Sequence, residues 1–251
     1  MNIITGGVCA AKGFQANGIH CGIRKNHSKK DLALIYSKVP ANAAAVYTTN
    51  LVKGAPLLVT RAHIADGRAQ AVICNSGNAN TCNADGVEIA EAMSDLVAQQ
   101  LSIPAGDVVV ASTGVIGQPL KLDPIAAGLP ALAGGLNPDG SAAAAEAIMT
   151  TDTVRKEIAV EFELDGKTCH LGGIAKGSLI PAITINEARQ LRENGVISGG
   201  MIPKVECCID AIHRGVKNAI IMDGRVPHSI LMEILTDEGA GTMVSGGNDN
   251  D

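Results

Sequence analysis

The sequence changes character between Ser178 and Leu179, and this change limits what the chain can fold into. Before this boundary, glycine-rich loops separate short β-branched runs and alanine-rich stretches, a pattern typical of mixed α and β structure. After it, the order helix, glycine loop, helix, strand, helix is typical of an α/β segment. We therefore expect an α/β protein in two parts, residues 1–178 and 179–244, with a polar tail at residues 245–251.

Composition indicates an ordinary globular protein. Hydrophobic residues make up 46% of the 251 positions and charged residues 18%, which is enough apolar material for a core. Aromatic residues are scarce and the net charge is -5, so nucleic-acid binding is not expected. No apolar run is long enough to span a bilayer, and the first residues lack the pattern of a secretory signal. A cytoplasmic protein without membrane contact is expected.

The cysteines and histidines indicate neither a disulfide framework nor a metal site. Seven cysteines form an odd set without C-x-x-C spacing, which is typical of a reduced cytoplasmic protein. The histidines show no clustered spacing for zinc. Cys207 and Cys208 are neighbours in a predicted helix, where two buried small side chains are favoured over a metal site or a disulfide.

Hydrophobic periodicity predicts three helices before the boundary. Apolar residues three and four positions apart predict a helix at residues 86–101. A connecting helix is expected within residues 119–140, and another over residues 141–152, opened by a cap from Ser141. The predicted apolar face of the first helix consists of Val87, Ala90, Met93, Leu96, Val97 and Leu101.

Strands are predicted from β-branched and alternating runs. A hairpin is expected over residues 156–175, with Asp165 and Gly166 as its two-residue turn. The other predicted strands lie at residues 32–39, 43–50, 69–75 and 107–112.

Beyond the boundary, Thr184 and Glu187 form a T-x-x-E capping box ahead of a predicted helix at residues 185–193. The remaining elements expected there are a loop, a helix, a strand and a helix, at residues 195–200, 201–213, 216–222 and 228–235.

Four motifs precede the boundary: NSGNANTCNADG, STGVIG, MTTDT and GGIAKGS, at residues 75–86, 112–117, 149–153 and 172–178. In this order they resemble the precursor of ornithine acetyltransferase, also called glutamate N-acetyltransferase, of the arginine pathway. The resemblance covers residues 8–178. It implies a layered fold of sheets packed between helices, and acetyl transfer between N-acetylornithine and glutamate without a cofactor.

Thr113 and Gly114 follow a predicted buried strand, where backbone N–H groups can point at a ligand. Such donors suit an oxyanion hole, which stabilises a developing negative oxygen. The resemblance implies this role for the two residues. By itself, the spacing also fits a tight turn after a strand.

Thr151 and Lys176 are the substrate-binding residues that the resemblance implies. Small residues around Lys176 would let its ammonium group approach a carboxylate. Taken alone, the two residues also fit a helix end and a solvated lysine.

The nucleophile of the resembled family is missing. In that family the precursor cuts itself at an Ala-Thr pair, and the freed threonine attacks the substrate, activated by its own amine. Counting from Lys176 as the family does, Glu187 takes that place, and no Ala-Thr pair follows. Thr184 is better explained as a helix cap, and Ser178 is a weak substitute. The isolated chain is therefore expected to stay uncut and inactive.

Residues 179–244 resemble the carboxy-terminal part of N-acetylglutamate kinase, in the runs LIPAITINEARQLRENGVISGGMIPKVE and IIMDGRVPHSILMEILTDEGAGTMV. The resemblance implies part of an amino-acid-kinase α/β/α sandwich. It also implies that Gly199, Gly200 and Lys204 bind the phosphates of ATP at a helix N-terminus. A lysine snorkelling to solvent explains Lys204 equally well. The catalytic lysine and the acetylglutamate pocket of that family have no counterpart in residues 1–178.

Three hypotheses follow for function. The first is an acetyltransferase acting on N-acetylornithine and glutamate, which would need a nucleophile from another chain. The second is a kinase-like fragment that binds ATP or N-acetylglutamate with a partner. The third is a catalytically silent fusion that exposes apolar surface and self-associates.

Overall fold

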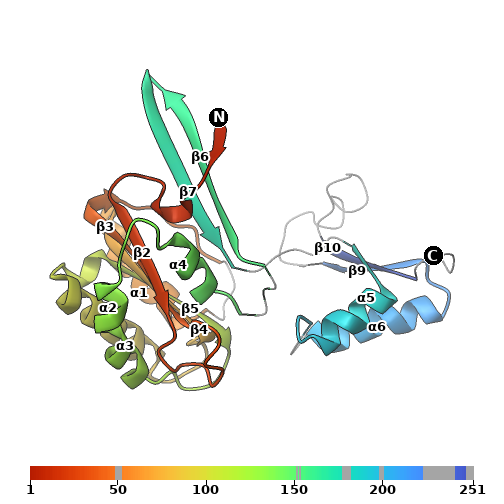
Figure 1. Cartoon of the computed structure of the whole chain (residues 1–251). Coiled ribbons are helices and arrows are strands. Elements are labelled where there is room, and N and C mark those ends of the chain that lie inside the picture. Colours follow the sequence, from red (N-terminus) through yellow and green to blue (C-terminus); the bar gives the residue numbers. More distant parts are fainter. Residues whose placement is uncertain are drawn as a thin grey trace. The chain divides into compact units, whose positions relative to one another are not determined.

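The computed structural model describes residues 1–48, 53–150, 152, 154–176, 182–197, 201–222 and 241–246 (Figure 1). The chain divides into two units. Unit 1 consists of Met1–Thr150 and Val154–Lys176, and unit 2 of Thr151–Thr153 and Gly177–Asp251. Among the described residues, no helix is both long and apolar enough to cross a membrane.

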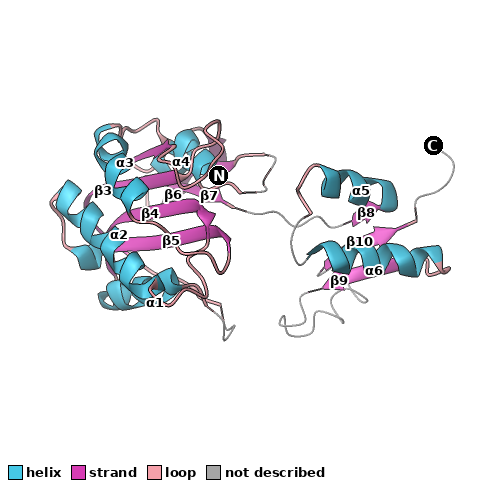
Figure 2. Ribbon diagram, turned by 90° about the horizontal axis from the view of Figure 1, so that it is seen from below, coloured by secondary structure: helices cyan, strands magenta, loops and turns pink. Residues whose placement is uncertain are grey.

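A four-stranded mixed sheet forms the centre of unit 1 (Figure 2). Its strand order is β2-β3-β4-β5, with β4 and β5 parallel and the other pairs antiparallel. Because β5 is an edge strand, one side of its backbone has no strand neighbour in this sheet. The strands are β2 (Phe14–Ile19), β3 (Leu32–Asn42), β4 (Arg68–Asn78) and β5 (Val108–Val115).

Helices cover both faces of this sheet, and alternating strand residues supply the two cores. Leu32 and Leu34 face the larger core with helices α1 (Ala55–His63), α2 (Gly86–Leu101) and α3 (Asp123–Gly134). Ala33, between them, belongs to a smaller core beneath α4 (Ser141–Ala147). This period of two is what a strand buried on both faces requires. Three short 3₁₀ turns, η1 (Gly7–Cys9), η2 (Ile64–Asp66) and η3 (Ala105–Asp107), complete the connections.

A second, antiparallel sheet in unit 1 has the order β1-β6-β7, from β1 (Asn2–Ile4), β6 (Lys156–Leu164) and β7 (Lys167–Ala175). The turn of the hairpin has positive φ at both positions, 51° at Asp165 and 71° at Gly166, as a type I′ turn requires. Figure 1 shows this hairpin projecting from the rest of unit 1. The hairpin predicted from the sequence is confirmed in position and turn.

Unit 2 contains β8 (Ala182–Thr184), α5 (Ile185–Glu193), α6 (Met201–His213), β9 (Asn218–Met222) and β10 (Gly241–Ser245). Its sheet order is β8-β10-β9, with β10 parallel to β8 and antiparallel to β9. A small core from both helices and the sheet includes Ile183, Ala188, Ile197, Val205 and Val244.

The helices at residues 86–101, 185–193 and 201–213 are confirmed, and the strand predicted from residue 216 begins at Asn218. The helix predicted at residues 228–235 lies outside the described residues. Two burial predictions are wrong. Val87 is 43% exposed, because the apolar face of α2 begins one turn later at Ala90, and Cys207 is exposed on α6.

Two element predictions also need correction. Residues 43–48 form no strand, and Val46 is fully exposed. A run with high β propensity needs a neighbouring strand, and β3 already ends at Asn42. Residues 49 and 50 lie outside the described residues.

Ser141 does not cap α4, which ends at Ala147 instead of reaching the threonines. Its hydroxyl accepts the N–H of Val8 at 3.0 Å and donates to Glu157 at 2.9 Å. Tertiary hydrogen bonds therefore replace the local cap.

Candidate functional site

Thr113 and Gly114 lie at the carboxy-terminal end of edge strand β5. The outer side of β5 is the side away from β4. Earlier in the strand, at Val110, helix α1 covers this side: the Thr60 hydroxyl donates to the Val110 carbonyl at 2.8 Å and accepts the Val110 N–H at 3.0 Å. The Val115 carbonyl instead accepts from Ala79 on the β4 side, at 2.8 Å. Because successive residues of a strand alternate sides, the N–H of Gly114 falls on the outer side, away from β4.

Gly114 occupies a place that no other residue fits. Its φ is +137°, and a Cβ built on it would lie 2.3 Å from the carbonyl carbon of Gly77 and 2.5 Å from the nitrogen of Asn78. Both contacts are with backbone, which cannot move aside cheaply. The ends of β4 and β5 therefore touch without intervening side chains.

Arg24 ties the end of β4 to the end of helix α4. A Cβ on Gly77 would lie 2.8 Å from Cγ of Arg24, so the arginine stem lies across this glycine. The guanidinium group donates to the carbonyl of Met149, two residues after the end of α4. Ser76 makes a parallel link, since its hydroxyl donates to the Ala147 carbonyl at 2.5 Å. The chain entering the T-T-D motif is thus held at the ends of the two strands.

Lys176 directly follows β7, and its ammonium group acts on Cys74 of β4. Burial raises the pKa of the Cys74 thiol to about 12, and the positive charge of Lys176 works in the opposite direction. Cys74 and Ile174, two residues before Lys176, both pack against the small core beneath α4. Thr151, the other predicted substrate residue, lies outside the described residues.

Buried asparagines hold the loops that follow β4 and β5. Asn75 and Asn80 are fully buried, and the amide of Asn75 donates to the Asn78 carbonyl at 2.9 Å. The Asn78 amide in turn donates to the Gln118 carbonyl at 2.9 Å. Ser112 donates to the Asn75 side chain at 2.6 Å. The NSGNAN sequence therefore supplies the hydrogen bonds that keep STGVIG beside it.

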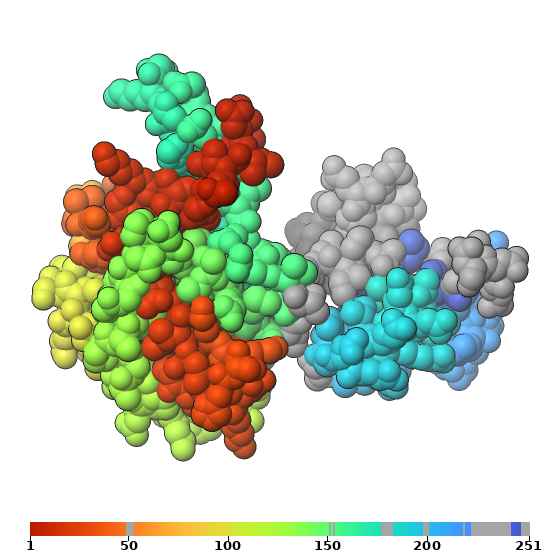
Figure 3. All heavy atoms as spheres, viewed as in Figure 1, coloured from red at the N-terminus to blue at the C-terminus, as the bar shows by residue number. Residues whose placement is uncertain are grey.

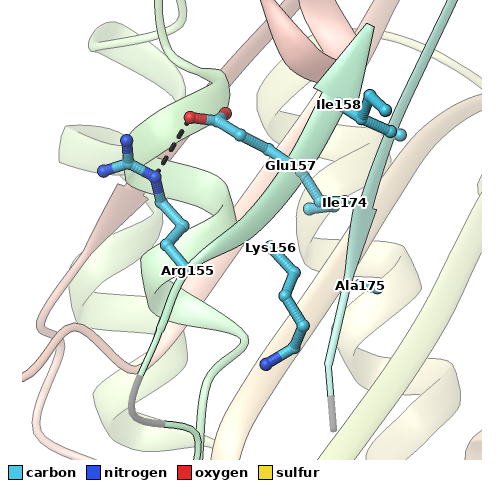
Figure 4. A pocket seen from close by; sticks show the side chains of 7 residues that line it. Arg155, Lys156, Glu157, Ile158, Ile174 and Ala175 are labelled. Atoms are coloured by element: carbon cyan, nitrogen blue, oxygen red, sulfur yellow. Dashed lines mark ion pairs between the residues drawn. The ribbon is translucent and has the colours of Figure 1, made fainter. Parts of the chain in front are cut away.

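A hollow of about 460 Å³ lies at the base of the β6–β7 hairpin, where Figure 4 shows its lining residues. Its walls are residues 155–158 and 173–175, so it ends one residue before Lys176. Arg155 pairs with Glu157 at 3.0 Å on one wall, and Ile174 and Ala175 form another. The hollow combines an apolar lining with cationic groups.

In unit 2, Lys204 lies in the first turn of α6 and is exposed, while Val205 beside it is buried. Gly199 and Gly200 lie outside the described residues. In the part of the chain that the structure describes, no cluster of three or more His, Cys, Asp or Glu side chains could hold a metal.

The predicted capping box is confirmed. Glu187 donates its backbone N–H to the Thr184 hydroxyl at 3.2 Å, and its carboxylate accepts the Thr184 N–H at 2.8 Å. The hydroxyl also donates to this carboxylate at 3.0 Å. The Thr184 hydroxyl is therefore fully engaged, and Glu187 is fixed on a helix.

Sequence reasoning missed Arg24, Ser76 and Gly77 as parts of this region. Ser76 and Gly77 belong to a motif noted in the sequence, but nothing there indicates that they contact α4 and Arg24. Arg24 is 125 residues away from Met149, and no local pattern signals so distant a contact.

Comparisons with known proteins agree with the four motifs within residues 75–178. The model of the ArgJ family matches residues 15–184. The arginine biosynthesis bifunctional protein ArgJ of Symbiobacterium thermophilum is 50% identical over 180 residues, which cover 71% of this chain and 45% of that protein. The protein of the same name from Gloeobacter violaceus is 51% identical over 177 residues, which cover 70% of this chain and 43% of that protein. The chain thus spans less than half the length of these curated relatives.

Solved structures match the same part of the chain. The arginine biosynthesis bifunctional protein argJ of Bacillus halodurans is 45% identical with a TM-score of 0.65, covering 70% of this chain and 94% of the solved one. Ornithine acetyltransferase of Mycobacterium tuberculosis, solved with ornithine, is 38% identical with a TM-score of 0.65. The match covers 70% of this chain and 95% of the solved chain. The family match includes the candidate oxyanion and lysine positions. The chain therefore belongs to the ArgJ family.

Proposed function

We propose that this chain is an arginine-biosynthesis protein of ornithine/glutamate N-acetyltransferase descent that retains the oxyanion hole but lacks the nucleophile. The observation that carries this proposal is the packing of Gly114 on Gly77 at the end of edge strand β5. It leaves the Gly114 N–H on the outer side of the strand, as a donor for the oxygen that becomes negative during acyl transfer. By the same alternation the Thr113 N–H faces β4, so Thr113 would contribute its side-chain hydroxyl as the second donor of this oxyanion hole.

Thr151 and Lys176 would bind the acetylated amino acid. Lys176 suits a carboxylate because it is an exposed, positively charged residue directly after β7. The substrates proposed are N-acetylornithine and glutamate, with N-acetylglutamate as the acetylated product. No cofactor is required for this transfer.

The chain is proposed to be inactive alone. At the position where the family pattern places its nucleophile stands Glu187, and the nearby Thr184 hydroxyl is held in the capping box. A hydroxyl used in this way is not available for attack. The chain spans less than half the length of its curated relatives, and the proposal therefore concerns this part of the protein by itself.

A transplant tests this proposal. Residues 1–178 are joined to the part of the Symbiobacterium relative that follows the matched region, and acetyl transfer from N-acetylornithine to glutamate is measured. Activity should appear in the transplant and not in the native chain, and it should fall at least about 100-fold in Gly114→Ala or Lys176→Ala. Gly106→Ala, whose new Cβ meets nothing within 4 Å, is the control. A folded transplant whose rate is unaffected by both variants would contradict the assigned roles.

As a second candidate, we propose that residues 179–244 are an N-acetylglutamate-kinase-like segment, fused to residues 1–178 and followed by a polar tail at residues 245–251. The observation in favour is that α6 begins at Met201, directly after the two glycines, with Lys204 exposed in its first turn. A lysine there costs roughly 0.3 to 1 kcal/mol against the helix dipole, and a bound phosphate reverses that sign. Gly199, Gly200 and Lys204 would then bind ATP. The fusion is also proposed to self-associate.

A further inference from the structure

A single buried carboxylate organises the loop at residues 20–31, between β2 and β3. Asp31 is 0% exposed and has no part in the proposed acetyl transfer. One of its oxygens accepts the N–H of Cys21 at 2.6 Å, and the other accepts the N–H groups of Arg24 at 2.9 Å and Gly22 at 3.3 Å. These donors satisfy the buried carboxylate and fold the loop around it. Figure 3 shows this loop in orange-red on the surface of unit 1.

The main chain of Asp31 is fixed to the central sheet on two sides. Its N–H donates to the Ile19 carbonyl of β2 at 2.8 Å, and its carbonyl accepts the Ser76 N–H of β4 at 2.9 Å. The thiol of Cys21 also lies against the carboxylate, since burial, followed by the negative charge of Asp31, raises the pKa of this thiol to about 12. The sheet therefore holds the carboxylate in place, and the carboxylate holds the loop.

Arg24, whose N–H bonds the carboxylate, contacts two segments of the candidate site. Its stem lies across Gly77, on which Gly114 packs. Its guanidinium group donates to the carbonyl of Met149, at the start of the T-T-D motif. Arg24 thus connects the Asp31 carboxylate with both the oxyanion strand and the segment that leads to the proposed substrate residue Thr151.

We propose that Asp31 is a positioning residue for the acetylated amino acid and acts through Arg24, a role that rests on the proposed function. The carboxylate fixes the backbone of Arg24, and the Arg24 side chain sets the position of the chain at Met149 relative to Gly114. Asp31 need not touch the substrate. A change at Asp31 and a change at Arg24 should therefore have the same consequence, and the two together should have no larger one.

The test follows the Met149 methyl group by NMR in the full chain, labelled at its seven methionines, with Met149→Leu to assign the signal. Asp31→Asn keeps the shape of the side chain but replaces one accepting oxygen by a donor, and Arg24→Gln removes the guanidinium group. Both should displace the Met149 signal in the same direction. Titration with N-acetylornithine, followed through this signal, should show an affinity lowered at least about threefold in each variant.

Glu146→Gln is the matched control. It removes another charged contact between the same loop and α4, the 3.0 Å pair of Lys30 and Glu146, without touching Arg24. Because both side chains of this pair are partly exposed, the affinity should stay within about twofold of wild type. Arg24→Lys keeps a cationic donor for the Met149 carbonyl and should recover most of the affinity lost in Arg24→Gln.

The double variant, Asp31→Asn with Arg24→Gln, decides whether the two residues act through one chain of contacts. It should bind N-acetylornithine as weakly as either single variant. A product of the two single effects, at least about ninefold, would show independent damage and overturn the proposal. Wild type that binds no N-acetylornithine would overturn the proposed function and this role with it. Binding by wild type that both single variants leave unchanged would overturn this role alone.

Discussion

Gly114 and Gly77 touch backbone to backbone, with 2.3 Å between a Cβ built on the first and the carbonyl carbon of the second. This contact closes the ends of two parallel strands on each other. It gives the glycine of the STGVIG motif a structural role in addition to its proposed catalytic one.

Gly114→Ala should therefore destabilise unit 1 by at least about 2 kcal/mol, because alanine would meet backbone at a strained φ. Urea unfolding followed by far-UV circular dichroism measures this, since the chain has no tryptophan. Gly106→Ala meets open space and should change stability little. Equal stabilities of the two variants would mean that the strand ends are not in contact.

Thr184→Ala should lower the stability of unit 2 by about 1 kcal/mol, through loss of the cap on α5. Thr184→Ser keeps the hydroxyl and should lose much less. Hydrogen exchange of the amides in the first turn of α5 locates the effect. If Thr184→Ala protects these amides as well as wild type does, the hydroxyl does not cap the helix.

The Thr184–Glu187 capping box also predicts how the stability of α5 depends on pH. Hydrogen bonds from the backbone and side chain of Thr184 lower the pKa of Glu187 below 4.5. A lowered pKa contributes stability that is present above the unfolded value and is lost as pH falls through the folded value. The protection of α5 should thus decrease below about pH 4.5 in wild type and stay flat in Glu187→Gln. The same pH dependence of α5 protection in wild type and Glu187→Gln would contradict this prediction.

His170 should titrate in the opposite sense. Its hydrogen bond to Glu161, with that to the Ala10 carbonyl, raises its pKa above 6.5. Stability from this pair is present below the unfolded pKa and disappears as pH rises through the folded one. The ring signals of His170 followed by NMR should titrate above 6.5, and Glu161→Gln should lower this pKa. A titration that Glu161→Gln does not move would show that the pair is not formed.

The purified chain should stay intact, because it lacks the Ala-Thr pair at which the resembled family cuts. Intact mass spectrometry after prolonged incubation measures this. Two fragments that meet between residues 176 and 190 would show a scissile bond that the sequence comparison overlooks. Their loss in Thr184→Ala or Ser178→Ala would identify the attacking residue.

Any ATP binding should be weak, decrease with salt and exceed the binding of N-acetylglutamate, because a phosphate site needs only a short folded segment. Calorimetric titration of wild type and Lys204→Ala checks this. Arg214→Ala removes a positive charge at the other end of α6 and serves as the control. Identical ATP binding by Lys204→Ala and wild type would remove the case for the kinase-like site.

Local patterns in the sequence predicted local structure well. Apolar spacing set the limits of α2, and the Thr184–Glu187 box set the start of α5, because both depend on residues within one or two turns. Ser141 was misread since its hydroxyl serves Val8 and Glu157, which are distant in sequence. The strand expected at residues 43–50 failed for a related reason: propensity alone does not supply a neighbour.

The candidate site shows the same contrast between local features, which the sequence predicts, and contacts between residues distant in the sequence, which it does not. The strand predicted at residues 107–112 put Thr113 and Gly114 just after its end, whereas the structure has them within the last residues of β5, which continues to Val115. The contacts of Arg24 with Gly77 and Met149 join segments that no periodicity connects. Only the folded chain brings such residues together.

The capping of β5 by α1 also determines how the protein can misassemble. Thr60 and His63 occupy the outer carbonyls of Val110 and Val108, so an incoming strand finds no row of open hydrogen-bonding groups there. Strand β7, at the margin of the other sheet, has no such side-chain cover from a helix among the described residues. Under stress, amyloid-like templating should therefore start from residues 167–175 in preference to the β5 edge, which would be recruited only after α1 detaches.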